Sequence, residues 1–475
     1  MRRKFCCAAA SLGLVLLFSG TRASAQDVPQ PTAGEPAKPA AKAYGPIGAE
    51  PQDPNQEPET MQPDDRPLTG FQQATVGTPI ARHSYWLPGI SYYNTIQSNG
   101  ASSGTSDGWN SSNYIAGNVS LLEAGSRSRL TLNASIGGFF SSNSQGNGWY
   151  QQIGVADTFN WERWQLTFLD QFAYLPQAQF GFGAGSGLGL PGVGGSLGGG
   201  SVGLGPGYDP GSSIFAATGP RYTNAFGTQA NYLLTPRSSV TFGGMLSLMR
   251  FTDSGSENIE SNTYIANLGY NYQISRADTI GVQYSFSSFH YLGFDQAIGS
   301  HTIQAVYGRK LTGRLALSIA GGPQIVNFRK PEGTTTATRF VTGSATTTLS
   351  YALQNGSLSV AYFHGLTGGS GALAGASTDQ VTVSGTRRLS RLWSGEAHVG
   401  FARNRNADTD TGLPNPSFHS TYVGTSLNRP LGRNASLTLG YTGYIASSNN
   451  VGGGDFTTHQ ITVGVSWHAR PFVLH

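Results

Sequence analysis

The chain has little charge, almost no cysteine and no long apolar segment. Of its 475 residues, 11% are charged and 38% are apolar, and its 2 cysteines, Cys6 and Cys7, lie close to the N-terminus. A soluble domain usually carries about 25% charged residues and a larger apolar fraction. Beyond residue 25, no apolar run approaches the roughly 18 residues of a transmembrane helix. These absences argue against an ordinary soluble enzyme and against a helical membrane protein.

The first 25 residues have the pattern of a secretory signal peptide. Arg2, Arg3 and Lys4 precede an apolar stretch over 8–18, and Ala23-Ser24-Ala25 provides a small-residue cleavage site. Removal of this segment would leave a chain without cysteine. Such a chain has no disulfide, no thiolate metal site and no cysteine nucleophile.

Residues 26–82 differ in composition from the rest of the chain. They hold 11 of the 24 prolines, together with scattered Ala, Gln, Glu and Asp. Such a stretch buries too little apolar surface to offset its ordering entropy, so we expect it to be extended or disordered. We interpret it as a periplasmic linker, with docking to a periplasmic partner as the alternative.

From residue 83 to the end, one alternating pattern recurs. In Ile280–Ser287 the residues Ile280, Val282, Tyr284 and Phe286 alternate with Gly281, Gln283, Ser285 and Ser287. A period of two indicates strands with one apolar and one polar neighbour. Repeated over nearly four hundred residues with almost no helical pattern, it predicts an all-β fold, a closed antiparallel transmembrane β-barrel. The soluble alternative, a β-propeller or β-solenoid, would show a fixed repeat, which the sequence lacks.

The connections between the predicted strands are alternately short and long. Short ones contain turn formers and often arginine, as in Ser275–Asp278, Leu311–Arg314 and Gln354–Ser357, where Asn355-Gly356 indicates a tight hairpin. Long ones are rich in Gly, Ser, Asn and Asp. The count gives about 18 strands, with 16 also compatible. Both chain ends then fall on the short-turn side, where arginines also concentrate.

These features resemble Gram-negative outer-membrane β-barrels of porin size. The resemblance covers 83–475 and includes a final strand, Thr458 to Trp467, that is similar to the C-terminal assembly signal of that family, although eight residues follow it. It implies location in the outer membrane with both termini in the periplasm. It also implies contact with outer-membrane lipid and lipopolysaccharide, and with the barrel-assembly machinery.

The longest connection, 175–220, is dominated by glycine between 181 and 207. It is the third long loop, and in porins the third loop folds inward and narrows the pore. By that resemblance, the candidate constriction residues are Phe180, Phe182, Leu188, Leu190 and Leu204. A solvent-exposed surface loop is the alternative, since long loops are either functional or disordered.

Predicted lumen positions are mostly Ser, Thr, Gly, Asn and Gln. The charged candidates for the lumen are Glu396, His398, Arg221, Arg309 and Arg403. A pore for phosphate or acidic polymers should show rings of Arg or Lys, so a neutral lining favours a passive channel for small polar solutes. The alternatives are a barrel that exports an exopolysaccharide with periplasmic partners, and a non-conducting structural or adhesion barrel.

The sequence offers no enzymatic or nucleic-acid-binding pattern. Its 9 histidines are dispersed, no zinc-binding spacing occurs, and Glu396 with His398 lacks an evident nucleophile. We therefore expect no catalytic residues, cofactor or metal. The formal net charge of +4 is too small for a nucleic-acid-binding surface.

Overall fold

The computed structural model describes residues 84–98, 109–141, 147–175, 181–182, 214–215, 220–252, 259–292, 296–329, 339–368, 375–407, 417–449 and 456–473. The predicted signal peptide, the linker 26–82 and most of the predicted long connections lie outside these ranges.

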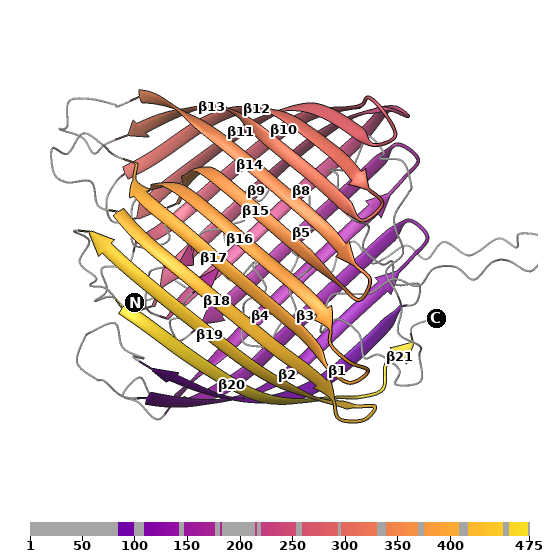
Figure 1. Cartoon of the computed structure of the whole chain (residues 1–475), viewed down its shortest axis with the longest axis vertical. Coiled ribbons are helices and arrows are strands. Elements are labelled where there is room, and N and C mark those ends of the chain that lie inside the picture. Colours follow the sequence, from indigo (N-terminus) through magenta and orange to yellow (C-terminus); the bar gives the residue numbers. More distant parts are fainter. Residues whose placement is uncertain are drawn as a thin grey trace, which may run out of the picture. The chain divides into compact units, whose positions relative to one another are not determined.

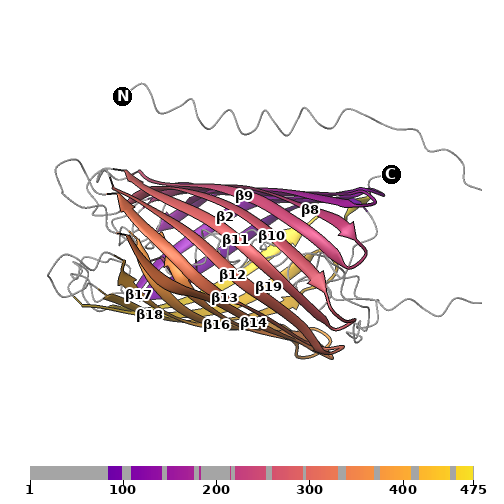
Figure 2. The same ribbon diagram turned by 90° about the horizontal axis from the view of Figure 1, so that it is seen from above.

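One antiparallel sheet contains nearly all of the strands, as the alternating pattern requires. Its long strands are β1 (Tyr85–Ser98), β2 (Trp109–Ala124), β3 (Ser128–Ser141), β4 (Asn147–Asn160), β5 (Trp164–Leu175), β8 (Arg221–Thr235), β9 (Ser238–Phe251), β10 (Glu260–Gln273), β11 (Asp278–Leu292), β12 (Gln296–Thr312), β13 (Leu315–Arg329), β14 (Arg339–Leu353), β15 (Gly356–Thr367), β16 (Ala376–Arg388), β17 (Ser394–Asn406), β18 (Ser417–Pro430), β19 (Ala435–Asn449) and β20 (Phe456–His468). Each pairs with the next along the chain, and they run obliquely around one continuous wall (Figures 1 and 2).

The sheet closes on itself. β1 pairs with β2 along one side and with β20 along the other. Of the 19 strands in this sheet, β21 (Phe472–Val473) is a two-residue addition beside β1, which leaves 18 barrel strands. The predicted closed barrel of about 18 antiparallel strands is therefore confirmed. Closure leaves no sheet edge with unpaired backbone groups, which hydrocarbon would not tolerate.

Two features seal the seam between β1 and β20. Tyr93 of β1 is paired with Gly464 of β20, and its ring lies where a side chain on residue 464 would project. After β20 the chain turns back beside β1, where Phe472 packs on Trp86 with ring centroids 5.6 Å apart. The residues that follow the predicted final strand thus cover the start of the first strand.

Short turns gather at one end of the barrel, which we call the turn end; the opposite end is the loop end (Figure 1). The predicted hairpin at Asn355-Gly356 is present, with Gln354 and Asn355 in the turn and Gly356 already in β15. A Cβ on Gly356 would overlap the carbonyl oxygen of Thr386, so the close approach of β16 requires glycine there.

Large apolar side chains cover the outside of the barrel. Ile90, Val282 and Val341 are 57%, 56% and 68% exposed. Aromatic side chains also lie there, with exposures of 38 to 51% for Trp164, Tyr264, Tyr270, Tyr272, Tyr441 and Trp467. Tyr422 differs from these residues, because it is 3% exposed and lies on the inner side with its neighbour Tyr444. Within the described residues, no helix is long and apolar enough to cross a membrane.

Candidate solute pathway

The strand register assigns each barrel residue to one of two faces. Paired residues on neighbouring strands share a face, and the face alternates along each strand. The residues that share a face with the exposed Ile90 can be followed from strand to strand around the barrel. The last of them is Trp467 of β20, which is itself paired with Ile90. The assignment is therefore consistent around the closed sheet. We call the face that carries Ile90 outward and the opposite face inward.

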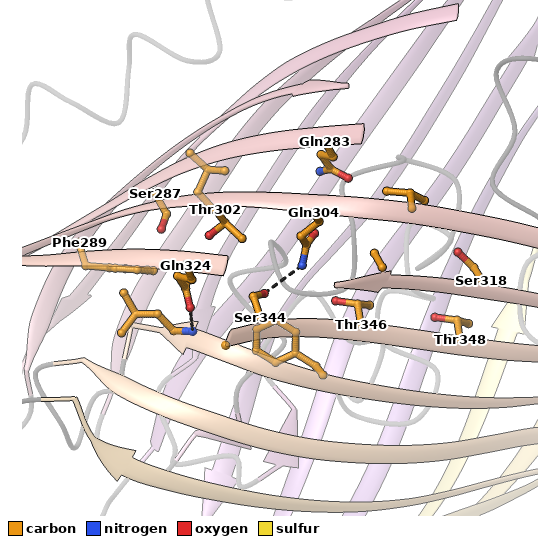
Figure 3. Close-up of a pocket in the computed structure, with 16 residues that line it drawn as sticks. Gln283, Ser287, Phe289, Thr302, Gln304, Ser318, Gln324, Ser344, Thr346 and Thr348 are labelled. Carbon is orange, nitrogen blue, oxygen red and sulfur yellow. Dashed lines mark hydrogen bonds between the residues drawn. The ribbon is translucent and has the colours of Figure 1, made fainter. Parts of the chain in front are cut away.

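The inward face over β10–β15 contains a cavity with an uncharged, hydrogen-bonding wall (Figure 3). Its polar lining residues are Gln283, Ser287, Thr302, Gln304, Ser318, Gln324, Ser344, Thr346 and Thr348. None of the residues that line this cavity is charged. Sheet geometry explains the lining, because a polar residue at every second position of adjacent strands produces a continuous polar surface.

Hydrogen bonds between strands fix the amides of this wall. Gln304 Nε2 donates to Ser344 Oγ at 2.9 Å, and Gln324 Nε2 donates to Ser300 Oγ at 3.2 Å. Gln324 Oε1 accepts a hydrogen bond from the backbone N–H of Leu366 at 3.2 Å. Because both ends of the Gln324 amide have partners, its orientation is set, and the wall presents oriented dipoles rather than charges.

Two apolar clusters project inward near the loop end. One is built around Phe289, Ile298, Val326 and Phe328 on β11–β13, and the other is formed by Tyr93, Tyr114, Ala116, Phe139 and Tyr150 on β1–β4. In the strand order, four strands separate the two groups in one direction and seven in the other. The clusters therefore lie on roughly opposite walls of the barrel.

Three of the five predicted lumen charges lie on the inward face. Glu396 and His398 are two residues apart near the turn end of β17, with His398 Nδ1 3.3 Å from Glu396 Oε1. Arg221 begins β8 at the loop end and is 2% exposed.

The prediction is wrong for Arg309 and Arg403, which lie on the outward face. Arg403 is an odd number of positions from the inward Glu396, so the two side chains point to opposite faces of β17. Arg403 therefore shares the outward face with Phe401, which is exposed. Arg309 lies near the turn end, where its Nε is 3.6 Å from Asp278 Oδ1. Charges are tolerated there because the barrel strands have 12 to 17 residues, and about 9–11 span the hydrocarbon.

The predicted constriction residues in 175–220 fall outside what the structure describes, apart from the backbone of Phe182. That residue belongs to β6 (Gly181–Phe182), which pairs with β7 (Ile214–Phe215) in a separate two-stranded sheet. The constriction by this loop stays a prediction.

Sequence reasoning missed two polar groups on the outward face. Asp170, in the middle of β5, accepts a hydrogen bond from Asn224 Nδ2 at 2.9 Å on β8. Near the loop end, His364 Nδ1 lies 2.6 Å from Asp379 Oδ1, and Arg405 donates to Asp379 Oδ2 at 3.0 Å. The partners are 15 to 54 residues apart, so strand pairing brings them together. A test of face parity along each strand would have identified these polar and charged side chains among the outward positions.

No described group of three His, Cys, Asp or Glu side chains is arranged to hold a metal ion. The His364–Asp379 pair resembles the base and orienting acid of a hydrolase. A hydrolase would also need a nucleophile on the second ring nitrogen, and the described residues show no hydroxyl bonded there.

No family model matches the chain, and no curated protein matches it. Solved structures with a similar arrangement include OpdQ of Pseudomonas aeruginosa, with 9% identity and a TM-score of 0.40 over 82% of this chain and 98% of that one. OccAB3 of Acinetobacter baumannii is 11% identical, with a TM-score of 0.41 over 83% and 100% of the two chains. A BenF-like porin from Pseudomonas fluorescens Pf-5 is 10% identical, with a TM-score of 0.40 over 82% and 98%. These values are too low to identify a family or a function, and the assignment of the fold rests on the strand pairing itself.

Proposed function

We propose that the protein is a passive channel of the Gram-negative outer membrane for small, uncharged polar solutes. The observation that carries this proposal is the neutral hydrogen-bonding wall on β10–β15, whose lining includes three glutamines and no charged side chain. Selective ion pores instead line their lumen with rings of charge. Hydroxyl and amide groups exchange hydrogen bonds with hydroxylated solutes at little net cost.

The membrane assignment follows from the barrel wall. An even number of antiparallel strands, an apolar outer face and turns that are short at one end are properties of outer-membrane barrels. In that orientation, the turn end and both chain ends face the periplasm and the loop end faces outward. The inward apolar clusters would then limit solute size near the outer mouth, and deletion of 181–207 tests whether the Gly-rich loop adds a second constriction.

Conductance and solute uptake test the function. The purified chain in a planar bilayer should show steady conductance with weak preference between cations and anions, and proteoliposomes should admit neutral monosaccharides. The double variant Gln304→Glu/Gln324→Glu adds two carboxylates to the wall and should make the channel cation-selective. Gln151→Glu, the same change on the outward face of β4, is the matched control.

Three outcomes would contradict the proposal. Absence of conductance both in the native chain and after deletion of 181–207 would exclude a channel. Failure of neutral sugars to enter would exclude the solute class. A selectivity change of equal size in Gln151→Glu would show that the glutamines of β12 and β13 do not line the path.

A further inference from the structure

Arginine recurs in the hairpin turns at the turn end of the barrel. Eight short turns join neighbouring strands there, and the structure describes all of them. Seven contain one arginine each, namely Arg127, Arg163, Arg237, Arg276, Arg314, Arg391 and Arg433. Among the residues of these turns, Glu162 is the single carboxylate. Tight turns select glycine, proline and small polar residues, so turn geometry does not account for a cation in nearly every turn.

Three further cations continue this pattern onto the inward face. Arg129, Lys310 and Arg388 lie within two residues of the turn end of β3, β12 and β16. Face parity places all three inward, as for Lys310, which is an even number of residues from Gln304 of the cavity wall. Among the described inward residues, Glu396 is the one carboxylate. We call the seven turn arginines and these three residues the basic rim.

The turn arginines of the rim are accessible and lack described counter-charges. All of them are exposed except Arg314, which is half-buried. Within the part of the chain that the structure describes, none of them forms an ion pair. Arg388 is fixed beside them, since its Nε donates to the carbonyl of Ser390 at 3.1 Å and its Nη2 to that of Arg391 at 3.0 Å. Like charges gathered at one opening repel one another and attract a polyanion.

The inward members of the rim distinguish between two kinds of polyanion. Headgroups of the surrounding lipid can be reached from the turns, but not from Arg129, Lys310 and Arg388, which face the lumen across the barrel wall. A ligand that contacts both sets of cations must lie across the opening of the barrel at its turn end.

The chain itself contains a polyanion close to this opening. Residues 50–65 contain no Lys or Arg and six carboxylates, Glu50, Asp53, Glu57, Glu59, Asp64 and Asp65. The same stretch has proline at positions 51, 54, 58 and 63, and proline reduces the conformational entropy that a chain loses when it is held in place. The first strand, β1, begins at the turn end with Tyr85, so the acidic stretch joins the barrel on the side of the rim.

The connection is long enough for the two to meet. Between the acidic stretch and β1 lie 19 residues, 66–84. A coil of this length spans about 25 Å, and a fully extended chain spans about 60 Å. Arg127, Arg163, Arg391 and Arg433 belong to turns about four strands or fewer from β1, which is about 20 Å at the spacing of strands in a sheet.

We propose that residues 50–65 dock on the basic rim and lie across the turn-end opening of their own barrel. Guanidinium groups bind carboxylates through paired, charge-assisted hydrogen bonds. Because the segment is tethered beside the rim, its effective concentration is high, and several weak ion pairs suffice to hold it. Docking brings carboxylates to one opening of the solute pathway, a consequence that rests on the proposed function.

Disulfide formation in the full chain without its signal peptide measures docking. Gln56→Cys and Ser126→Cys place one thiol in the acidic segment and one in an exposed turn of the rim, and no other cysteine follows residue 25. The chain is held in phosphatidylcholine nanodiscs, and the reaction of each thiol with a maleimide corrects for differences in reactivity. The corrected rate of disulfide formation reports how often the two sites meet.

Removal of rim charge should slow this reaction. Arg163→Gln/Arg391→Gln/Arg433→Gln should lower the rate about eightfold, because each exposed ion pair contributes about a factor of two. Arg329→Gln/Arg339→Gln/Arg403→Gln removes the same charge near the loop end and should keep the native rate. Asp53→Asn/Glu57→Gln/Glu59→Gln should slow the reaction as the rim variant does, and both sets together should slow it less than the product of the two effects.

The rate does not depend on conduction, so failure of the channel proposal and failure of this one are distinguishable. An unchanged rate in the rim variant, an equal fall in the loop-end control, or fully multiplicative effects of the two sets would each overturn the proposal. So would nanodiscs of phosphatidylglycerol that lower the native rate to that of the rim variant, because the rim would then prefer lipid headgroups. Heat-modifiable gel mobility verifies that every variant is folded.

Discussion

Closure of the barrel depends on the absence of a side chain at residue 464. The Tyr93 ring occupies that space, so that a Cβ on Gly464 would overlap its Cδ1 and Cε1 atoms. Tyr93 is 1% exposed and packs with Tyr114, Phe139 and Tyr150. We predict that Gly464→Ala forces this ring out of its place and weakens the seam between β1 and β20.

The size of the effect follows from how little the surroundings can yield. Overpacking a well-packed site costs about 1–3 kcal/mol. Tyr114 and Tyr150 are themselves 5% and 1% exposed, so the Tyr93 ring has little free space into which it can move. We therefore expect a loss near the upper part of that range, about 2–3 kcal/mol in the free energy of unfolding.

Denaturant unfolding in lipid vesicles, followed by tryptophan fluorescence, measures this loss. Gly343→Ala is the matched control, because Gly343 lies inside β14 and a Cβ there would meet nothing within 4 Å. Both variants add one methyl group within a strand, but only the methyl group at residue 464 meets a ring.

A double-mutant cycle completes the test. In a Tyr93→Ala background, Gly464→Ala should cost less than about 0.5 kcal/mol, since the overlapping ring is gone. Equal losses in Gly464→Ala and Gly343→Ala, or an undiminished loss without the ring, would refute the reasoning.

Two further stability predictions concern the outer wall and a turn. Asp170 lies mid-strand on the outward face, where a charged group is unfavourable, so Asp170→Leu/Asn224→Leu should stabilise the barrel in vesicles by about 1–2 kcal/mol. Asn224→Leu alone should destabilise the barrel by about 1–3 kcal/mol, because the Asp170 carboxylate loses its hydrogen-bond donor. Denaturant titrations should therefore give changes in the free energy of unfolding of opposite sign for the double and the single variant. Gly432 has φ of +110° in the turn before β19, a backbone conformation that favours glycine. Gly432→Ala should therefore lower the free energy of unfolding by about 1 kcal/mol, even though a Cβ there would meet no neighbouring atom. An unchanged melting temperature would contradict this.

Much of the fold was predictable because strand periodicity is a local property. The side chains of Ile280, Val282 and Tyr284 alternate with polar ones in the sequence, and they are outward in the structure. Turn residues such as Asn355 mark hairpins by their own backbone preferences. Together these local signals establish antiparallel neighbours, and from them the number of strands.

Individual site residues were less predictable. Arg309 and Arg403 are candidates for the lumen by sequence, yet they lie outward near strand ends. Tyr422 faces inward, unlike the exposed Tyr441 on the neighbouring strand. In each case, position along the strand and face parity decide the environment, and composition alone does not reveal either.

The sequence by itself determined that the chain forms antiparallel strands with one apolar and one polar face, because alternation and turn chemistry act between residues close in the chain. The tertiary structure decided which distant residues meet. Pairing across strands joins Asp170 to Asn224 and His364 to Asp379. Closure of the barrel decided the contact between Tyr93 and Gly464, because these residues meet only when the first and last barrel strands pair.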